Sequence, residues 1–146
     1  MANSEHTVNV LNHLLAIHNR SLPVYLRSAP PWTGRNGEAG MELLDSIADA
    51  HFAMVDRIGS MIVELDGVIR YGEFPHRFAD WHDLSLKFIL NKVYELQQLD
   101  VERISKCVQW LDGAPRAKAL AQEALGEAKA HLEAVEELTT GGPRLA

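Results

Sequence analysis

The chain has 146 residues, of which 47% are hydrophobic and 23% are charged, a composition typical of one globular domain. Its 14 basic and 20 acidic residues give a formal charge of −6, and no lysine or arginine precedes Arg20. Nucleic-acid binding needs a cationic surface that displaces counterions from phosphates, so this charge distribution argues against it. No apolar run approaches the roughly 18 residues of a membrane span, so no membrane association is expected.

The cysteine content indicates where the protein works. Cys107 is the only cysteine, which excludes an internal disulfide and a metal site made of several cysteines. Disulfides are typical of secreted proteins, and the N-terminus lacks the basic segment of a secretory signal. Both observations predict a cytoplasmic protein.

Apolar residues recur at helical spacing through most of the chain, and no segment shows the alternation of a β-strand. The pattern predicts an all-α protein with one domain over residues 1–146 and an ordered core over about 7–138. The four predicted helices cover, in chain order, about residues 7–28, 38–65, 83–111 and 116–138. Pro23 is expected to kink the first helix, and the tail at 139–146 is expected to fray.

The lengths of the connections predict how the helices are arranged. Residues 29–37 and 112–115 form short joints, which favour two antiparallel helical hairpins. Residues 66–82 show no helical period, and about 17 extended residues can span about 55 Å, more than the length of one helix. The second and third helices are therefore expected to run parallel in a four-helix bundle with a long crossover connection.

Three histidines lie on the apolar stripes of three different helices, namely His18, His51 and His131. Counted from the helix ends, these side chains and Glu95 fall near one level of the bundle. Asp100 is the alternative to Glu95, because its position lies closer to the centre of the apolar stripe of the third helix. Imidazole and carboxylate groups are ligands for iron, zinc and manganese, so the set predicts a metal site. The competing interpretation is that each histidine is a core residue hydrogen-bonded to a neighbour.

Two segments resemble a known family. Residues 7–16, Thr-Val-Asn-Val-Leu-Asn-His-Leu-Leu-Ala, resemble the first helix of the ferritin-like superfamily, nearest to its Dps (starvation-induced DNA-protection) branch. Residues 41–68 resemble the second helix of that branch, which ends in Leu-Gly-Gly, and Trp32 with Gly34 or Gly37 is similar to its His-Trp-Asn-x-x-Gly joint. The resemblance covers about the first half of the chain. It implies a ferritin-like four-helix bundle that oxidises Fe(II), and often a shell of subunits that stores the ferric product.

The ligands of the family are only partly present. Asp56 matches a metal-binding aspartate of the Dps pattern, but Ser60 stands where a glutamate is expected and Met41 where a histidine is expected. In ferritins and bacterioferritins the second and fourth helices each carry Glu-x-x-His, whereas here Ala48 and Ala128 precede the two histidines at that spacing. Bridging two irons normally uses several carboxylates, so ferroxidase activity is expected to be weak or absent.

The sequence therefore predicts a ferritin-like, iron-related metal-binding protein that forms a homo-oligomer. The expected ligands of a single metal ion are His18, His51, Glu95 and His131, and zinc and manganese remain alternatives to iron. Whether the protein is an enzyme stays open. The alternative function is that of a structural or interaction protein with the ferritin fold and no metal chemistry.

Overall fold

The computed structural model describes residues 2–31, 37–81 and 84–140, and the elements of regular secondary structure in this part of the chain are all helices. The prediction of an all-α chain is confirmed for these residues. In chain order the elements are α1 (Ala2–Asn19), α2 (Leu22–Ser28), α3 (Glu38–Glu64), the 3-10 helix η1 (His76–Asp80), α4 (Leu86–Trp110) and α5 (Pro115–Thr140). None of these helices combines the length and the hydropathy that crossing a membrane requires.

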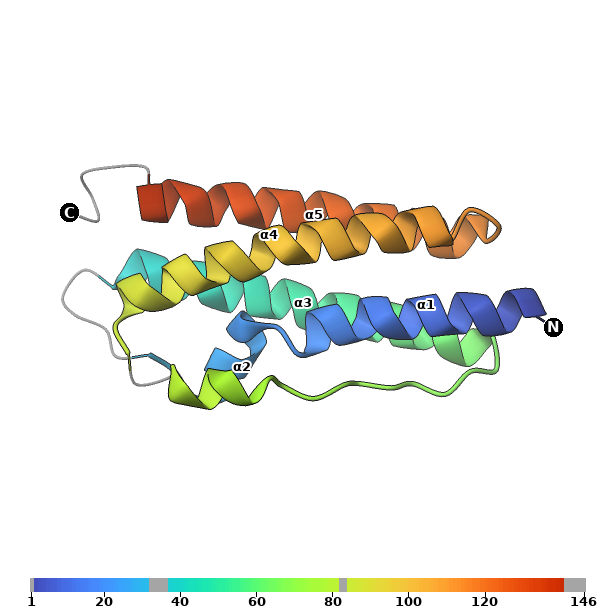
Figure 1. Cartoon of the computed structure of the whole chain (residues 1–146), viewed down its shortest axis with the longest axis horizontal. Coiled ribbons are helices and arrows are strands. Elements are labelled where there is room, and N and C mark those ends of the chain that lie inside the picture. The colour runs from blue at the N-terminus through green and yellow to red at the C-terminus, as the bar shows by residue number, and fades with distance from the viewer. Residues whose placement is uncertain (1, 32–36, 82–83, 141–146) are drawn as a thin grey trace.

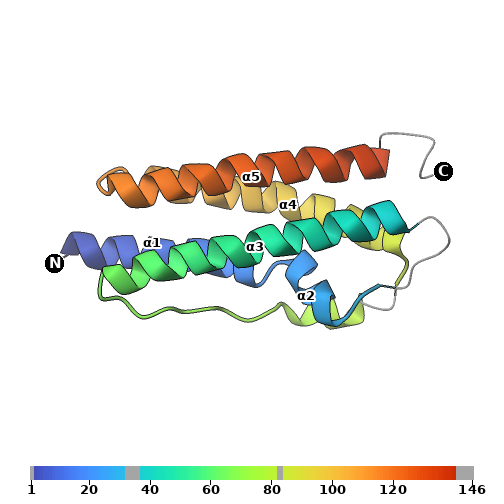
Figure 2. The same cartoon turned by 180° about the vertical axis from the view of Figure 1, so that it is seen from behind.

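The four long helices lie side by side as a bundle. Figures 1 and 2 show that α1 runs antiparallel to α3 and that α4 runs antiparallel to α5. The connection from α3 to α4 passes back along the bundle before η1, so α3 and α4 run parallel, as its length predicts (Figure 1). Short α2 lies beside η1 at one end of the molecule (Figures 1 and 2).

The first predicted helix is wrong in two respects: it begins at Ala2 rather than near residue 7, and it is two helices rather than one kinked helix. Helix α1 ends at Asn19, and α2 begins at Leu22 after Ser21, whose backbone is extended with φ −70° and ψ 156°. Pro23 lies in the first turn of α2, where its missing N–H has no intrahelical acceptor to lose. The proline therefore starts a new helix instead of bending an existing one.

Two further predictions change at helix ends. The third long helix begins at Leu86 instead of residue 83, since Ser85 accepts a hydrogen bond from Phe88 N at 3.3 Å and caps it. Helix α5 extends to Thr140, so the predicted fraying does not apply to the first two residues of the tail. Residues 141–146 lie outside the described part of the chain, as do Trp32 and Gly34 of the first joint.

The apolar interior consists of two clusters, one towards each end of the bundle. The first is built on Leu11, Leu14, Met54, Ile58, Ile104 and Ala124 among others. The second is built on Leu22, Leu26, Ile47, Phe78, Val93 and Val135 among others. Each cluster receives side chains from α3, α4 and α5, so the clusters follow one another along the same helices.

The crossover is held against α1 by a side-chain amide. Asn12 Nδ2 donates to Val68 O at 2.9 Å, and Arg70 N donates to Asn12 Oδ1 at 2.7 Å. Asn12 thus satisfies a carbonyl and an N–H of a segment that has no helical hydrogen bonds of its own. Gly67 allows the close approach, because a Cβ there would lie 2.6 Å from Val8 Cγ1.

Replacement of Asn12 by alanine is expected to lower the free energy of unfolding by about 2 kcal/mol, since two part-buried hydrogen bonds are lost. Urea denaturation measures the change, and hydrogen exchange of the Arg70 amide should accelerate. Asn9→Ala is the control, because Asn9 is exposed on the same helix and the substitution has the same effect on helix propensity. Equal effects of the two substitutions would contradict the proposed role of Asn12.

Candidate functional site

A polar layer separates the two apolar clusters and consists of His18, His51, Gln97 and His131. On α3, α4 and α5, one of these residues falls between a member of the first cluster and a member of the second, and His18 lies between such members at the junction of α1 and α2. On α1, for example, Ile17 belongs to the first cluster, His18 follows it, and Leu22 at the start of α2 belongs to the second. The layer therefore crosses the interior of the bundle.

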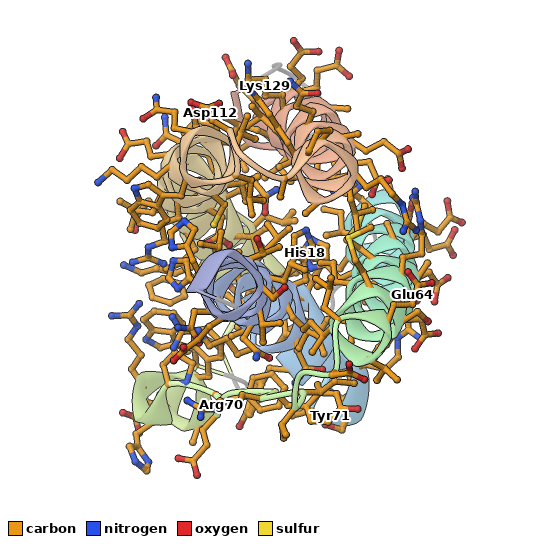
Figure 3. All side chains as sticks on the ribbon, turned by 90° about the vertical axis from the view of Figure 1, so that its right-hand side faces the viewer. His18, Glu64, Arg70, Tyr71, Asp112 and Lys129 are labelled. Atoms are coloured by element: carbon orange, nitrogen blue, oxygen red, sulfur yellow. The ribbon has the colours of Figure 1, made fainter. Side chains whose placement is uncertain are left out.

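Inside this layer the imidazole ring of His51 contacts the rings of His18 and His131. The ring centroids of His18 and His51 are 5.1 Å apart, and those of His51 and His131 are 5.8 Å apart. Both pairs meet edge to face, with interplanar angles of 82° and 63°. Figure 3, a view along the helices, shows His18 in the middle of the bundle. The sequence-based expectation that the three histidines lie at one level agrees with this arrangement.

Hydrogen bonds at Nδ1 orient two of the rings. His18 Nδ1 lies 2.8 Å from Leu14 O, and because a carbonyl only accepts, this nitrogen carries the proton. The lone pair of neutral His18 is then on Nε2. His51 Nδ1 lies 2.7 Å from Ser21 Oγ, which bonds this histidine instead of capping α2. Sequence analysis missed Ser21, although a serine two residues before a proline is a signal for a helix start.

The third ring has an unsatisfied polar atom. His131 Nδ1 is buried and has no hydrogen-bond partner. One turn away on the same helix, Ala128 O accepts a hydrogen bond from Gln97 Nε2 at 3.2 Å. A buried nitrogen without a partner is costly, so His131 is the position in the layer where an additional ligand would contribute most.

Burial keeps the imidazoles neutral. Desolvation lowers the pKa of His18 to about 4, and the backbone hydrogen bond to Leu14 opposes it only in part. The pKa of His51 is well below its usual value, first through desolvation and then through repulsion from the other two rings. Desolvation also lowers the pKa of His131. At neutral pH the layer is therefore polar and uncharged, and each ring keeps one lone pair.

The predicted carboxylate ligand does not lie in the layer. The Glu95 side chain is 61% exposed and pairs with Lys92 at 3.4 Å. The inward residue of this part of α4 is Gln97, which is only 3% exposed. Residues two apart on a helix differ by about 200° in direction, so counting depth from helix ends does not distinguish Glu95 from Gln97.

The alternative carboxylate, Asp100, faces a different neighbourhood. Its side chain is mostly buried and pairs with Arg103 at 3.3 Å. Desolvation raises the pKa of Asp100 to about 6, against the effects of Arg103 and Arg20. Asp100 lines a small cavity together with Ser21, so this hydroxyl lies between the cavity and the histidines.

The positions taken from the family pattern do not form a site either. Asp56 and Ser60 are exposed on α3 and line a shallow depression beside the crossover. Met41 is half-buried and packs against the second apolar cluster. Asp56 and Ser60 lie at the surface whereas Met41 packs against the core, so the three side chains do not meet at one point within the chain.

The side chains of the layer do not form a metal site in their present arrangement. Across residues 2–31, 37–81 and 84–140, no group of three or more histidine, cysteine, aspartate or glutamate side chains is arranged to hold a metal ion. In the structure the rings of His18 and His131 each pack edge to face against the ring of His51. Three neutral imidazoles that turn towards one another would supply nitrogen ligands for a single ion, whereas a bridged pair of irons needs carboxylates that the layer does not supply.

Comparison with known proteins gives no family assignment. No protein-family model matches the chain, and no curated protein matches its sequence.

The neutral histidines predict how stability depends on pH. The pKa of His18 is about 4 in the folded protein and about 6.5 when unfolded, so the unfolded chain binds more protons between these values. The stability that the neutral ring contributes is therefore complete above about pH 6.5 and is lost as the pH falls towards 4. We expect the stability advantage of the wild type over His18→Gln to shrink by about 2 kcal/mol between about pH 7.5 and about pH 5.

Urea denaturation of both proteins at each pH measures this difference. Asp100 titrates in the same range but is present in both proteins, so its contribution cancels. His76→Gln is the control, since His76 is exposed in η1 and lies outside the layer. A pH-independent advantage of the wild type over His18→Gln would show that burial does not hold this ring neutral.

Proposed function

We propose that the polar layer binds a single divalent transition-metal ion through His18, His51 and His131. The observation that carries the proposal is that His51 contacts both His18 and His131 in the interior; His18 and His51 are buried, and half-buried His131 has a buried Nδ1 without a partner. Imidazoles held neutral by burial need not lose a proton before they bind a metal. Binding requires the rings to turn from edge-to-face packing towards a common centre.

The surroundings of the rings support this ligand set. The bond from His18 Nδ1 to Leu14 O leaves Nε2 as the ligand atom, and backbone carbonyls commonly orient metal-binding histidines in this way. Ser21 Oγ holds His51 at Nδ1, and when the hydroxyl accepts from this nitrogen, Nε2 of His51 is likewise the ligand atom. His131 contributes either nitrogen, because its Nδ1 has no competing partner.

The donor set also limits the choice of metal. Nitrogen ligands suit zinc and Fe(II), whereas manganese prefers oxygen ligands. Three neutral ligands leave the full charge of the ion uncompensated, and this penalty is larger for Fe(III) than for Fe(II). The site therefore favours a divalent ion that stays divalent, and we expect no ferroxidase activity.

The proposal includes a ferritin-like bundle that forms a homo-oligomer. The parallel course of α3 and α4 and the crossover along the bundle support the ferritin-like topology (Figure 1). Exposed apolar side chains support self-association, because Val63, Val68 and Tyr71 lie on α3 and the adjoining crossover and are more than half exposed.

Metal loading tests the proposed function. Chelator-treated protein is incubated with Fe(II) under anaerobic conditions, with Zn(II) or with Mn(II), and the retained metal is measured by elemental analysis. We expect about one zinc or iron ion per chain and little manganese. A metal at about a hundredfold its dissociation constant should add about 2.7 kcal/mol to the free energy of unfolding and raise the melting temperature.

Variants locate the metal. His18→Ala, His51→Ala and His131→Ala should each abolish retention, whereas His76→Ala should leave it unchanged because His76 is exposed. A well-folded protein that retains no metal and gains no thermal stability would overturn the proposal. That result would favour the structural alternative, which the present packing of the rings against one another also fits.

A further inference from the structure

A small cavity lies beside the polar layer, at the end of α1 and between η1 and α4. Its volume is about 120 Å³. The polar side chains that line it are Arg20, Ser21, Arg77, Asp100 and Arg103. Phe78 and Leu96 provide part of its apolar wall. The cavity thus brings together residues from three segments that are far apart in the sequence.

The charges around this cavity are unbalanced. Three guanidinium groups line it, but Asp100 is the one carboxylate among its described lining residues. Asp100 pairs with Arg103 at 3.3 Å, and within the described ranges neither Arg20 nor Arg77 forms an ion pair. The Arg77 Cζ atom lies 5.7 Å from the centre of the Trp81 ring, a contact that positions this group without neutralising it. Such an excess of positive charge is notable in a chain whose formal charge is −6.

We propose that this cavity binds a small oxyanion, either inorganic phosphate or a short carboxylate, between Arg20, Arg77 and Arg103. Guanidinium groups present forked N–H donors that match the oxygens of phosphate and carboxylate. Ser21 also lines the cavity, on the side of the polar layer. A volume of about 120 Å³ is enough to hold a phosphate-sized ion.

The carboxylate of Asp100 repels an anion bound in the cavity. The carboxylate occupies one side of Arg103, so it limits how tightly an anion binds and holds the guanidinium in place when no anion is bound. Burial raises the pKa of Asp100 to about 6, and a bound anion would favour its protonated form further. This oxyanion site uses no histidine of the layer, so it does not depend on the proposed metal site.

Calorimetric titration of the full chain at low ionic strength tests the proposal. Phosphate, acetate and chloride are compared at matched ionic strength, because general screening affects all three anions alike. We expect about one phosphate per chain and no saturable chloride binding. Acetate that binds as tightly as phosphate would identify carboxylates as ligands of the same site and would equally support it.

Single substitutions locate the oxyanion. Arg20→Gln, Arg77→Gln and Arg103→Gln should each weaken phosphate binding about tenfold, since each removes a charge-assisted contact. Asp100→Asn should tighten binding about threefold, because it removes the opposing charge while keeping the shape of the side chain. Circular dichroism confirms that each variant keeps its helices.

Arg116→Gln is the matched control. Arg116 is an exposed arginine that pairs with Glu64 at 3.1 Å, away from the cavity. If Arg116→Gln and Arg103→Gln weaken phosphate binding equally, the effect is general charge and the site is excluded. The proposal is also overturned if phosphate binds no better than chloride.

Discussion

The polar layer is the constraint on which the rest of the structure depends. Polar groups buried between two apolar clusters cost least when they are uncharged and hydrogen-bonded, and His131 Nδ1 is the atom of the layer that lacks such a bond. His18 meets this condition through Leu14 O in its own helix, but His51 needs a partner from another segment. The interruption between α1 and α2 supplies that partner, because it leaves Ser21 free to turn its hydroxyl inward.

Ser21 also joins two environments of opposite character. Its hydroxyl contacts His51, in a layer that burial keeps neutral. Ser21 also lines a cavity in which guanidinium groups outnumber carboxylates. The interruption of the first helix therefore explains both features, since a continuous helix through this region would direct the serine hydroxyl to its own carbonyls or to solvent.

Periodicity predicted the helices, and counting from their ends predicted that His18, His51 and His131 lie at one level, because all three follow apolar stripes. The same counting failed for Glu95, since depth along a helix does not define direction around it. The interruption at Ser21 was missed because a proline within an apolar stripe resembles a kink. The cavity arginines could not be found from sequence, as only the crossover brings Arg77 to Arg103.

Burial has opposing effects on metal binding at such a layer. Desolvation penalises the imidazolium form, so protons compete less with a metal at these rings than at exposed histidines. The same desolvation penalises a divalent ion that only neutral ligands surround. An anionic fourth ligand such as hydroxide would relieve this penalty, and because Glu95 lies at the surface, such a ligand would have to come from solvent. The balance between these effects decides whether the layer is a metal site or a hydrogen-bonded spacer.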